Sequence, residues 1–224
     1  MPGRSSSGFV VALVGAESTG KTTLAVSLRN ALVAPALRDA GVEPVRRVAL
    51  VPEVLREFCD AHGRTPLQHE QAGIAAEQTR RIAAAARGHD IVIADTTALM
   101  IAVYSEQVFG DTGLYASAQV DHARCDLTLL TALDLPWQSD GLQRDGPHVR
   151  APVDALVRAA LGRAGASYAI VSGSGPARLA AALTSVLRAL APPPTDVGTS
   201  PRWQWHCERC GEPGCERHVM LPRD

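Results

Sequence analysis

The sequence has few aromatic residues and no excess of charge of either sign. Phe, Trp and Tyr make up 4% of its 224 residues, and the formal net charge is −1. Without a broad basic surface, binding along nucleic acid by release of counterions is not expected. Hydrophobic residues nevertheless reach 46%. A chain of this length can therefore bury a sizeable core, built mainly of Ala, Leu and Val.

Long apolar runs and a disulfide framework are also missing. No run is long enough to span a bilayer, and residues 1–8, expected to be a disordered N-terminus, contain no apolar signal core. The cysteines number five, an odd count, and three of them lie within the last eighteen residues. We therefore expect a cytoplasmic protein with no membrane partner and no disulfide scaffold.

A glycine-containing motif follows the first apolar run. Residues 15–22 read Gly-Ala-Glu-Ser-Thr-Gly-Lys-Thr and match the phosphate-binding pattern G-x-x-x-x-G-K-[ST] in full. The run 9–14 before it predicts a strand, and the spacing over 23–32 after it predicts a helix. The alternative is an ordinary strand-to-helix turn, which the Lys-Thr pair and both flanks disfavour.

The motif predicts a site for a nucleoside triphosphate and Mg²⁺. Inward-pointing backbone N–H groups and the positive end of a helix dipole favour phosphate oxygens. Lys21 should reach the β- and γ-phosphates, and the Thr22 hydroxyl should bind Mg²⁺. The residues expected to hold the nucleotide are Gly15, Ala16, Glu17, Ser18, Thr19, Gly20, Lys21, Thr22 and Thr23.

Strand and helix patterns alternate along the rest of the chain. Further strands are predicted at 46–51, 91–94, 126–131 and 168–171, and further helices at 53–61, 66–87, 99–108, 114–124 and 176–190. This alternation predicts an α/β, three-layer P-loop fold over residues 9–190, with a five-stranded parallel sheet. Residues 134–152 are expected to form a polar lid, and residues 191–202 a Pro-rich linker to a tail over 203–224.

Two carboxylates follow predicted strands on the same sheet edge as the phosphate loop. Asp95 ends the third strand and would act on Mg²⁺, unless it caps the following helix. Glu53 ends the second strand and would accept a proton from an acceptor hydroxyl, unless it is a first-turn charge favoured by the helix dipole. Arg56 would hold substrate or orient Glu53, or form an ordinary i, i+3 surface pair.

The predicted lid contains further candidates. Arg144 and Arg150 would fold over the γ-phosphate and stabilise its transition-state charge, or they are solvated loop charges. Trp137 would stack on a planar ring of the substrate or anchor the base of the lid. Asp140 is a further substrate-binding candidate.

Taken together, these segments resemble a known family. The likeness is to the kinase domain of NadR-type bacterial proteins, a ribosylnicotinamide kinase of the AAA-like P-loop class, and it covers roughly residues 9–190. The segments that carry it are Val-Gly-Ala-Glu-Ser-Thr-Gly-Lys-Thr-Thr-Leu (14–24), Pro-Glu-Val-Leu-Arg-Glu-Phe (52–58), the helix with Gln71 and Gln78, Ala-Asp-Thr (94–96) and Asp-Leu-Pro-Trp-Gln-Ser-Asp-Gly-Leu (134–142).

The resemblance implies ATP-dependent phosphorylation of the ribose hydroxyl of nicotinamide riboside to nicotinamide mononucleotide, a step of NAD salvage. Residues 15–22 would hold ATP, Asp95 would lie at the metal, and Trp137 near the nicotinamide ring. Where the family usually has Arg after Asp-Gly-x, this chain has Gln143, with Arg144 one position later. The adenylyltransferase portion and a helix-turn-helix segment are not among these residues, so neither adenylylation nor DNA-bound repression is expected.

The tail carries a separate hypothesis. Cys207 and Cys210, then Cys215 and His218, form two ligand pairs at spacings that suit tetrahedral zinc. The alternatives are a disordered tail with exposed thiols or a redox-active cysteine pair. Two other functions also stay open: another nucleoside kinase, and an ATP-hydrolysing P-loop switch whose zinc tail binds a partner.

Overall fold

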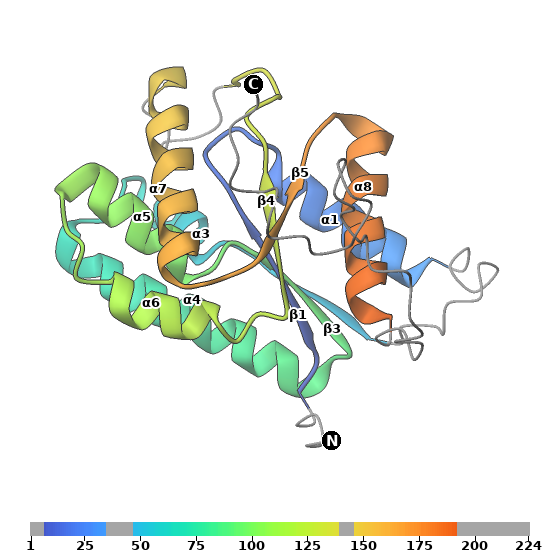
Figure 1. The fold of residues 1–224 in the computed structure, drawn as a ribbon. Coiled ribbons are helices and arrows are strands. Elements are labelled where there is room, and N and C mark those ends of the chain that lie inside the picture. The colour runs from blue at the N-terminus through green and yellow to red at the C-terminus, as the bar shows by residue number, and fades with distance from the viewer. Residues whose placement is uncertain (1–6, 35–46, 139–145, 192–224) are drawn as a thin grey trace, which may run out of the picture. The chain divides into compact units, whose positions relative to one another are not determined.

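The computed structural model describes residues 7–34, 47–138 and 146–191. Strands and helices alternate along the chain as the sequence predicts (Figure 1). The elements are β1 (Phe9–Val14), α1 (Lys21–Val33), β2 (Val48–Val51), α3 (Val54–His62), α4 (Gln68–Gly88), β3 (Ile91–Asp95), α5 (Ala98–Phe109), α6 (Tyr115–His122), β4 (Leu127–Thr131), the 3₁₀ turn η1 (Pro147–Val149), α7 (Arg150–Arg163), β5 (Tyr168–Val171) and α8 (Gly175–Leu190).

The five strands form one parallel sheet in the order β2-β3-β1-β4-β5. β1 is central and buried along its whole length, with Leu13 opposite Asp95 of β3 and Val14 opposite Leu130 of β4. Because all strands run the same way, their carboxyl ends meet at one edge of the sheet. The loops that follow β1, β3 and β4 are therefore neighbours.

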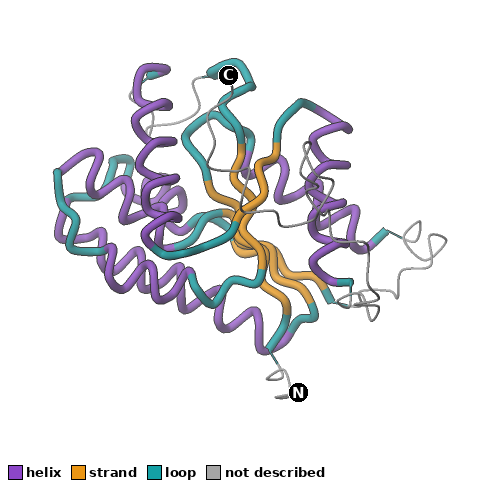
Figure 2. Tube along the Cα trace, in the orientation of Figure 1, coloured by secondary structure: helices purple, strands orange, loops and turns teal. Residues whose placement is uncertain are grey.

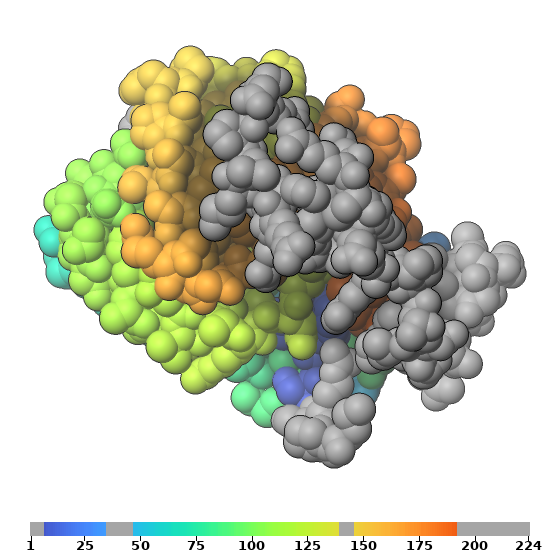
Figure 3. Space-filling model, viewed as in Figure 1, coloured from blue at the N-terminus to red at the C-terminus, as the bar shows by residue number. Residues whose placement is uncertain are grey.

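Helices cover both faces of the sheet, as its predominantly apolar strands require. Val11 and Leu13 pack with α1 and α8 on one face, whereas Val14 and Leu130 pack with α5 and α7 on the other. Figure 2 shows the strands lying between these two layers of helices. On the second face, α5, α6 and α7 make up a continuous surface (Figure 3). The predicted three-layer α/β fold is confirmed.

The structure corrects the predicted end of the lid. Residues 147–152 were expected to be loop, but they form η1 and the first turn of α7. Pro152 is the third residue of α7, where its missing N–H would have no intrahelical acceptor, so proline is tolerated there. The apolar face that anchors α7 lies farther along, at Val153, Val157 and Leu161, which are all fully buried.

None of the helices that the structure describes is both long enough and apolar enough to cross a bilayer.

A buried histidine braces the start of α5, directly after β3. His122 Nδ1 lies 3.0 Å from the Thr97 hydroxyl, and its Nε2 lies 3.0 Å from the Thr128 hydroxyl. Thr97 is the N-cap of α5 and accepts a hydrogen bond from the Leu99 N–H. Burial disfavours the charged imidazolium and lowers the pKa of His122 to about 4. The histidine is therefore neutral in the folded protein near pH 7.

This burial makes stability depend on pH. The unfolded chain binds a proton at His122 near pH 6.5 and the folded chain only near pH 4, so the contribution is present above pH 6.5 and is lost as the pH falls toward 4. Between pH 7 and pH 5 we expect a loss of about 2 kcal/mol in the free energy of unfolding from this group. Urea denaturation at the two pH values measures this loss. The free energy of unfolding should change less with pH in His122→Gln than in the parent. The control His69→Gln, at an exposed position, should behave as the parent.

Candidate active site

The phosphate loop between β1 and α1 is shaped by contacts with β4. Gly15 has φ +144°, and a Cβ atom there would lie 2.2 Å from the Thr131 hydroxyl oxygen, so only glycine fits. The Thr19 hydroxyl lies 2.7 Å from that of Thr131 and donates to the Ala16 carbonyl oxygen at 2.7 Å. Gly20, the N-cap of α1, adopts a left-handed conformation with φ 73°. The loop thus has a defined shape at a helix N-terminus.

Lys21 folds back over this loop. Its Nζ donates to the carbonyl oxygens of Gly15 at 2.8 Å and Ala16 at 2.7 Å, and the side chain is buried. The ammonium group therefore already lies over the concave side of the loop, where phosphate oxygens would replace or join the carbonyls as its partners. Thr22 is exposed in the first turn of α1, in the position that the motif assigns to a Mg²⁺ ligand.

Arg178, which the sequence analysis missed, ties the phosphate loop to two other loops. Its guanidinium donates to the Thr19 carbonyl oxygen at 2.8 Å, the Gly173 carbonyl oxygen at 2.8 Å and Asp134 Oδ1 at 2.9 Å. Only 4% of Arg178 is exposed. Burial opposes ionisation of Asp134, but the Gly173 N–H and the Arg178 guanidinium outweigh it and lower the pKa of that carboxyl.

Asp95 lies where the sequence predicts, and its alternative role is excluded. It is the last residue of β3, it is 3% exposed, and its Oδ1 has no hydrogen-bond partner among the described residues. Thr97, not Asp95, caps the next helix. Between them Thr96 has φ 75°, a strained conformation for a β-branched residue. A buried carboxylate oxygen without a partner at the end of this strand fits a cation ligand.

Glu53 is buried at the start of α3, between β2 and the helix. It is 7% exposed, it makes no capping hydrogen bond, and Arg56 Nε lies 3.7 Å from its Oε2. Gln78 holds this junction: its amide oxygen accepts from the Val54 N–H at 2.8 Å, and its Nε2 donates to the Pro52 carbonyl oxygen at 3.3 Å. The helix α4 thus holds the backbone on both sides of Glu53.

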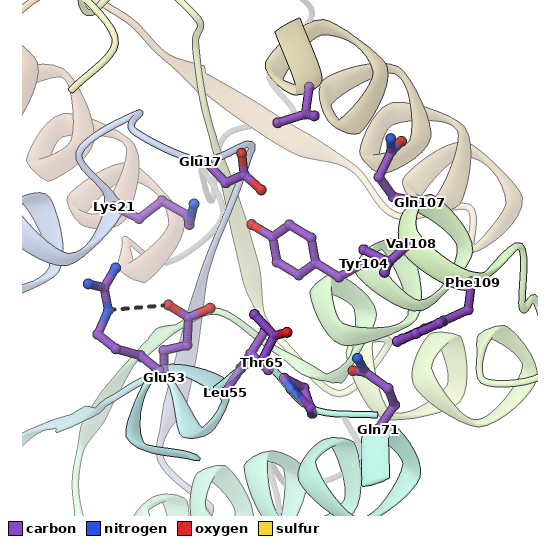
Figure 4. A pocket seen from close by; sticks show the side chains of 13 residues that line it. Glu17, Lys21, Glu53, Leu55, Thr65, Gln71, Tyr104, Gln107, Val108 and Phe109 are labelled. Atoms are coloured by element: carbon purple, nitrogen blue, oxygen red, sulfur yellow. Dashed lines mark ion pairs between the residues drawn. The ribbon is translucent and has the colours of Figure 1, made fainter. Parts of the chain in front are cut away.

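A cavity of about 130 Å³ lies between Lys21 and Glu53 and extends away from the phosphate loop. Glu17, Lys21 and Glu53 lie at one end of it, Gln71 and Phe109 at the other, and Tyr104 between them (Figure 4). The other lining residues are Leu55, Arg56, Thr65, Pro66, Gln107, Val108 and Val149. The cavity therefore connects the phosphate loop, at the Lys21 end, to the Glu53 carboxylate and to an uncharged, largely apolar chamber formed by α3, α4 and α5.

A second, wider cavity of about 860 Å³ lies on the other side of the phosphate loop. It is lined by Ser18 and Gly20 of the loop, by α1, by the segment after β4, and by the start of α8 with Arg178. The Ser18 hydroxyl joins this segment to the loop, accepting from the Gln138 N–H at 2.8 Å. One loop thus forms a wall of both cavities.

Comparison with known proteins shows which family this chain belongs to. A family model described as an AAA domain matches residues 10–178. The chain belongs to this family of AAA domains. Two solved structures of NadR protein are similar to this chain, one in complex with NAD and AMP-PNP and the other in complex with NR. Each has a TM-score of 0.60 and 20% sequence identity and covers 81% of this chain. The match covers 49% of the first NadR chain and 51% of the second. The chain thus spans about half the length of these NadR structures.

Thymidylate kinase from Ehrlichia chaffeensis is similar with a TM-score of 0.54 at 14% identity, over 83% of this chain and 100% of its own. A search of the curated proteins gave no match. The likeness to these structures shows that the AAA domain has a kinase-like P-loop fold.

The structure of this AAA domain describes two further predicted residues, Arg150 and Trp137. Arg150 begins α7, and its Nη1 donates to the Leu135 carbonyl oxygen at 2.9 Å, so it is a buried anchor for the segment after β4. Its Nε and Nη2 have no partner among the described residues. Trp137 is half-buried and lines neither cavity, and its indole N–H is likewise without a partner in the described part of the chain.

Several predicted residues lie outside the described ranges: Asp140 and Arg144 in the lid, and Cys207, Cys210, Cys215 and His218 in the tail, together with the predicted linker beyond residue 191. Within those ranges no cluster of three His, Cys, Asp or Glu side chains could hold a metal ion.

Removal of the Arg178 guanidinium should loosen the phosphate loop of the AAA domain. In Arg178→Met the Thr19 and Gly173 carbonyls and the Asp134 carboxylate lose a buried partner, and we expect the free energy of unfolding to fall by about 3 kcal/mol. Affinity for a magnesium nucleoside triphosphate should fall as well, because the loop is no longer held in its binding conformation. Urea denaturation and titration calorimetry measure the two effects. Arg188→Met, an exposed change on the same helix, should alter neither.

Proposed function

We propose that this AAA domain is an ATP-dependent small-molecule kinase that phosphorylates the ribose hydroxyl of nicotinamide riboside to give nicotinamide mononucleotide. The observation that carries the proposal is the single cavity that brings the Lys21 ammonium and the Glu53 carboxylate together at one end and holds an apolar chamber at the other. A simple nucleoside triphosphatase needs no such chamber beside its phosphate loop. An enzyme with an organic acceptor does.

The structural neighbours support this choice. Two of them are NadR proteins, one holding NR and one holding NAD and AMP-PNP, and a third is a thymidylate kinase. All three are similar to this chain in fold. The sequence motifs that resemble the NadR-type kinase domain include Glu53 and Gln71, which line the cavity, and Asp95, which ends β3.

The proposed reaction is an in-line phosphoryl transfer. The Glu53 carboxylate accepts the proton of the ribose hydroxyl as that oxygen attacks the γ-phosphorus of ATP. The new bond joins the ribose oxygen to phosphorus, the bond between the γ-phosphorus and the β,γ-bridging oxygen breaks, and ADP leaves. Arg56, whose Nε lies 3.7 Å from Glu53 Oε2, orients this carboxylate.

Charge on the transferred group is stabilised by the phosphate loop and its neighbours. Lys21 and the loop N–H groups bind the β- and γ-phosphates. Thr22 and Asp95 would hold Mg²⁺, directly or through water, and the bound ion would neutralise charge on the phosphate oxygens. Arg144 is the proposed lid arginine, and Arg150, at the start of α7, is a proposed second cation for the γ-phosphate. Asp140 and Trp137 are the proposed contacts to substrate, and Cys207, Cys210, Cys215 and His218 a proposed structural zinc site.

A coupled assay of ADP release tests the reaction. With Mg-ATP and nicotinamide riboside we expect turnover that Lys21→Ala abolishes, because the phosphates lose their main cationic ligand. In Glu53→Gln, kcat should fall by about a hundredfold or more, since no group accepts the hydroxyl proton. The matched control Glu57→Gln changes a half-exposed glutamate that pairs with Arg81 on the outer side of α3, and it should retain activity.

Other outcomes of this assay have distinct meanings. Turnover with a different nucleoside but not with nicotinamide riboside would keep the kinase and replace its substrate. ADP release that no nucleoside or nucleotide stimulates would contradict the kinase and favour an ATP-hydrolysing switch.

The role of Asp95 predicts a separate effect on metal dependence. In Asp95→Asn the Mg²⁺ concentration for half-maximal rate should rise by about tenfold, because one anionic partner of the ion is lost. Titration of the rate against Mg²⁺ at saturating ATP measures this. An unchanged Mg²⁺ requirement, with kcat lowered, would assign Asp95 to a role other than metal binding.

A further inference from the structure

Gln71 is a buried polar side chain in the apolar end of the cavity. It lies on the first turn of α4, only 4% of it is exposed, and its amide points into the cavity (Figure 4). Its Oε1 has no hydrogen-bond partner among the described residues. A buried amide oxygen left without a donor loses its hydration without compensation. A ligand that donates to it would remove this penalty.

The same helix offers an internal comparison. Gln78 lies two turns farther along α4 and is fully buried, but its amide is satisfied at both ends by Val54 and Pro52. Gln78 is therefore a structural residue that holds the β2–α3 junction. Gln71 has the same side chain on the same face of the helix, but its amide oxygen has no donor among the described residues and faces the cavity instead.

The surroundings of Gln71 restrict what it can bind. The charged residues that line the cavity are Glu17, Lys21, Glu53 and Arg56, and none of them belongs to α4 or α5. Away from these charges the walls are neutral: Pro66, Val108 and Phe109 are apolar or aromatic, and Thr65 and Gln107 are polar but uncharged. A planar ring fits between such walls. Among the described residues no cation lines this end of the cavity to receive a carboxylate, so a negatively charged ring substituent would lose its hydration without compensation.

We propose that Gln71 reads a neutral amide-type edge on the ring of the acceptor and thereby selects amide-bearing nucleosides against their carboxylate analogues. This inference rests on the proposed kinase function. A primary amide carries both a donor and an acceptor, so it pairs with a ligand edge that also carries both, such as a carboxamide or the lactam edge of a pyrimidine. A carboxylate has no donor for Oε1 and brings a charge as well.

The test compares two acceptors that differ only in this group, nicotinamide riboside and nicotinic acid riboside. In the parent, kcat/KM should favour the amide. In Gln71→Leu, which keeps the volume and removes the amide, kcat/KM for nicotinamide riboside should fall by about tenfold, through KM, and the preference between the two acceptors should shrink by a similar factor. The KM for ATP should not change, because Gln71 lies at the far end of the cavity from the phosphate loop.

A second variant should create a preference for the carboxylate analogue. Gln71→Lys places a cation at this position, so the preference should move toward nicotinic acid riboside by at least about tenfold. Gln119→Leu, an equivalent change on α6 that lines neither cavity described above, should leave both acceptors unaffected. Thermal unfolding of each variant shows that it is folded, and Gln71→Leu should not be less stable than the parent, because the unsatisfied oxygen is gone.

The outcomes separate this inference from the function on which it rests. If the parent phosphorylates a nucleoside but Gln71→Leu changes both acceptors equally, or raises the KM for ATP, Gln71 does not read the ring and the inference is wrong while the kinase stands. If the parent phosphorylates no nucleoside, the kinase proposal itself fails and the inference falls with it.

Discussion

The shape of the phosphate loop depends on partners that lie far away in the sequence. Thr131 lies against Gly15 and holds the Thr19 hydroxyl, and Arg178 holds the Thr19 carbonyl across 159 residues. The strand order makes these contacts possible, since β1 lies between β3 and β4. Thr131 at the end of β4 and Asp95 at the end of β3 therefore flank the loop on its two sides. A loop held in this way keeps its N–H groups oriented before any phosphate arrives, which is the preorganisation that anion binding and catalysis require.

The same loop divides the carboxyl edge of the sheet into two chambers. Ser18 and Gly20 line the wider cavity next to α1 and α8, whereas Glu17 and Lys21 line the narrower one next to α3, α4 and α5. In the proposed function, the nucleotide would occupy the first and the acceptor the second, so the γ-phosphate would lie at their junction. Lys21 is the residue of the loop that reaches this junction, and Glu53 faces it from β2. The division follows from the two helical layers, because each chamber is roofed by the helices of one face.

Local patterns in the sequence predicted most of the fold and the positions of several candidate residues. The phosphate motif, the apolar strands and the acidic residues at strand ends are short-range signals, and in the structure Lys21 and Glu53 line one cavity while Asp95 ends β3. Arg178 and Thr131 carry no local signal, because their roles are contacts with a loop more than a hundred residues away. The helix α7 was missed because Pro152 and the charged residues before it are typical of a loop, and only the later spacing of Val153, Val157 and Leu161 shows its buried face.

Gln71 and Gln78 show why the type and spacing of a residue cannot by themselves assign its role. They are seven positions apart, about two helical turns, so any amphipathic pattern gives them the same face. What differs is the partner opposite each. Backbone groups at the β2–α3 junction satisfy Gln78, whereas an open chamber faces Gln71. A buried amide that the protein leaves unsatisfied discriminates strongly, because a ligand with the wrong edge leaves it unpaired and adds an unpaired group of its own. Selectivity at this end of the cavity therefore arises from a penalty on mismatched rings as much as from attraction to the matching one.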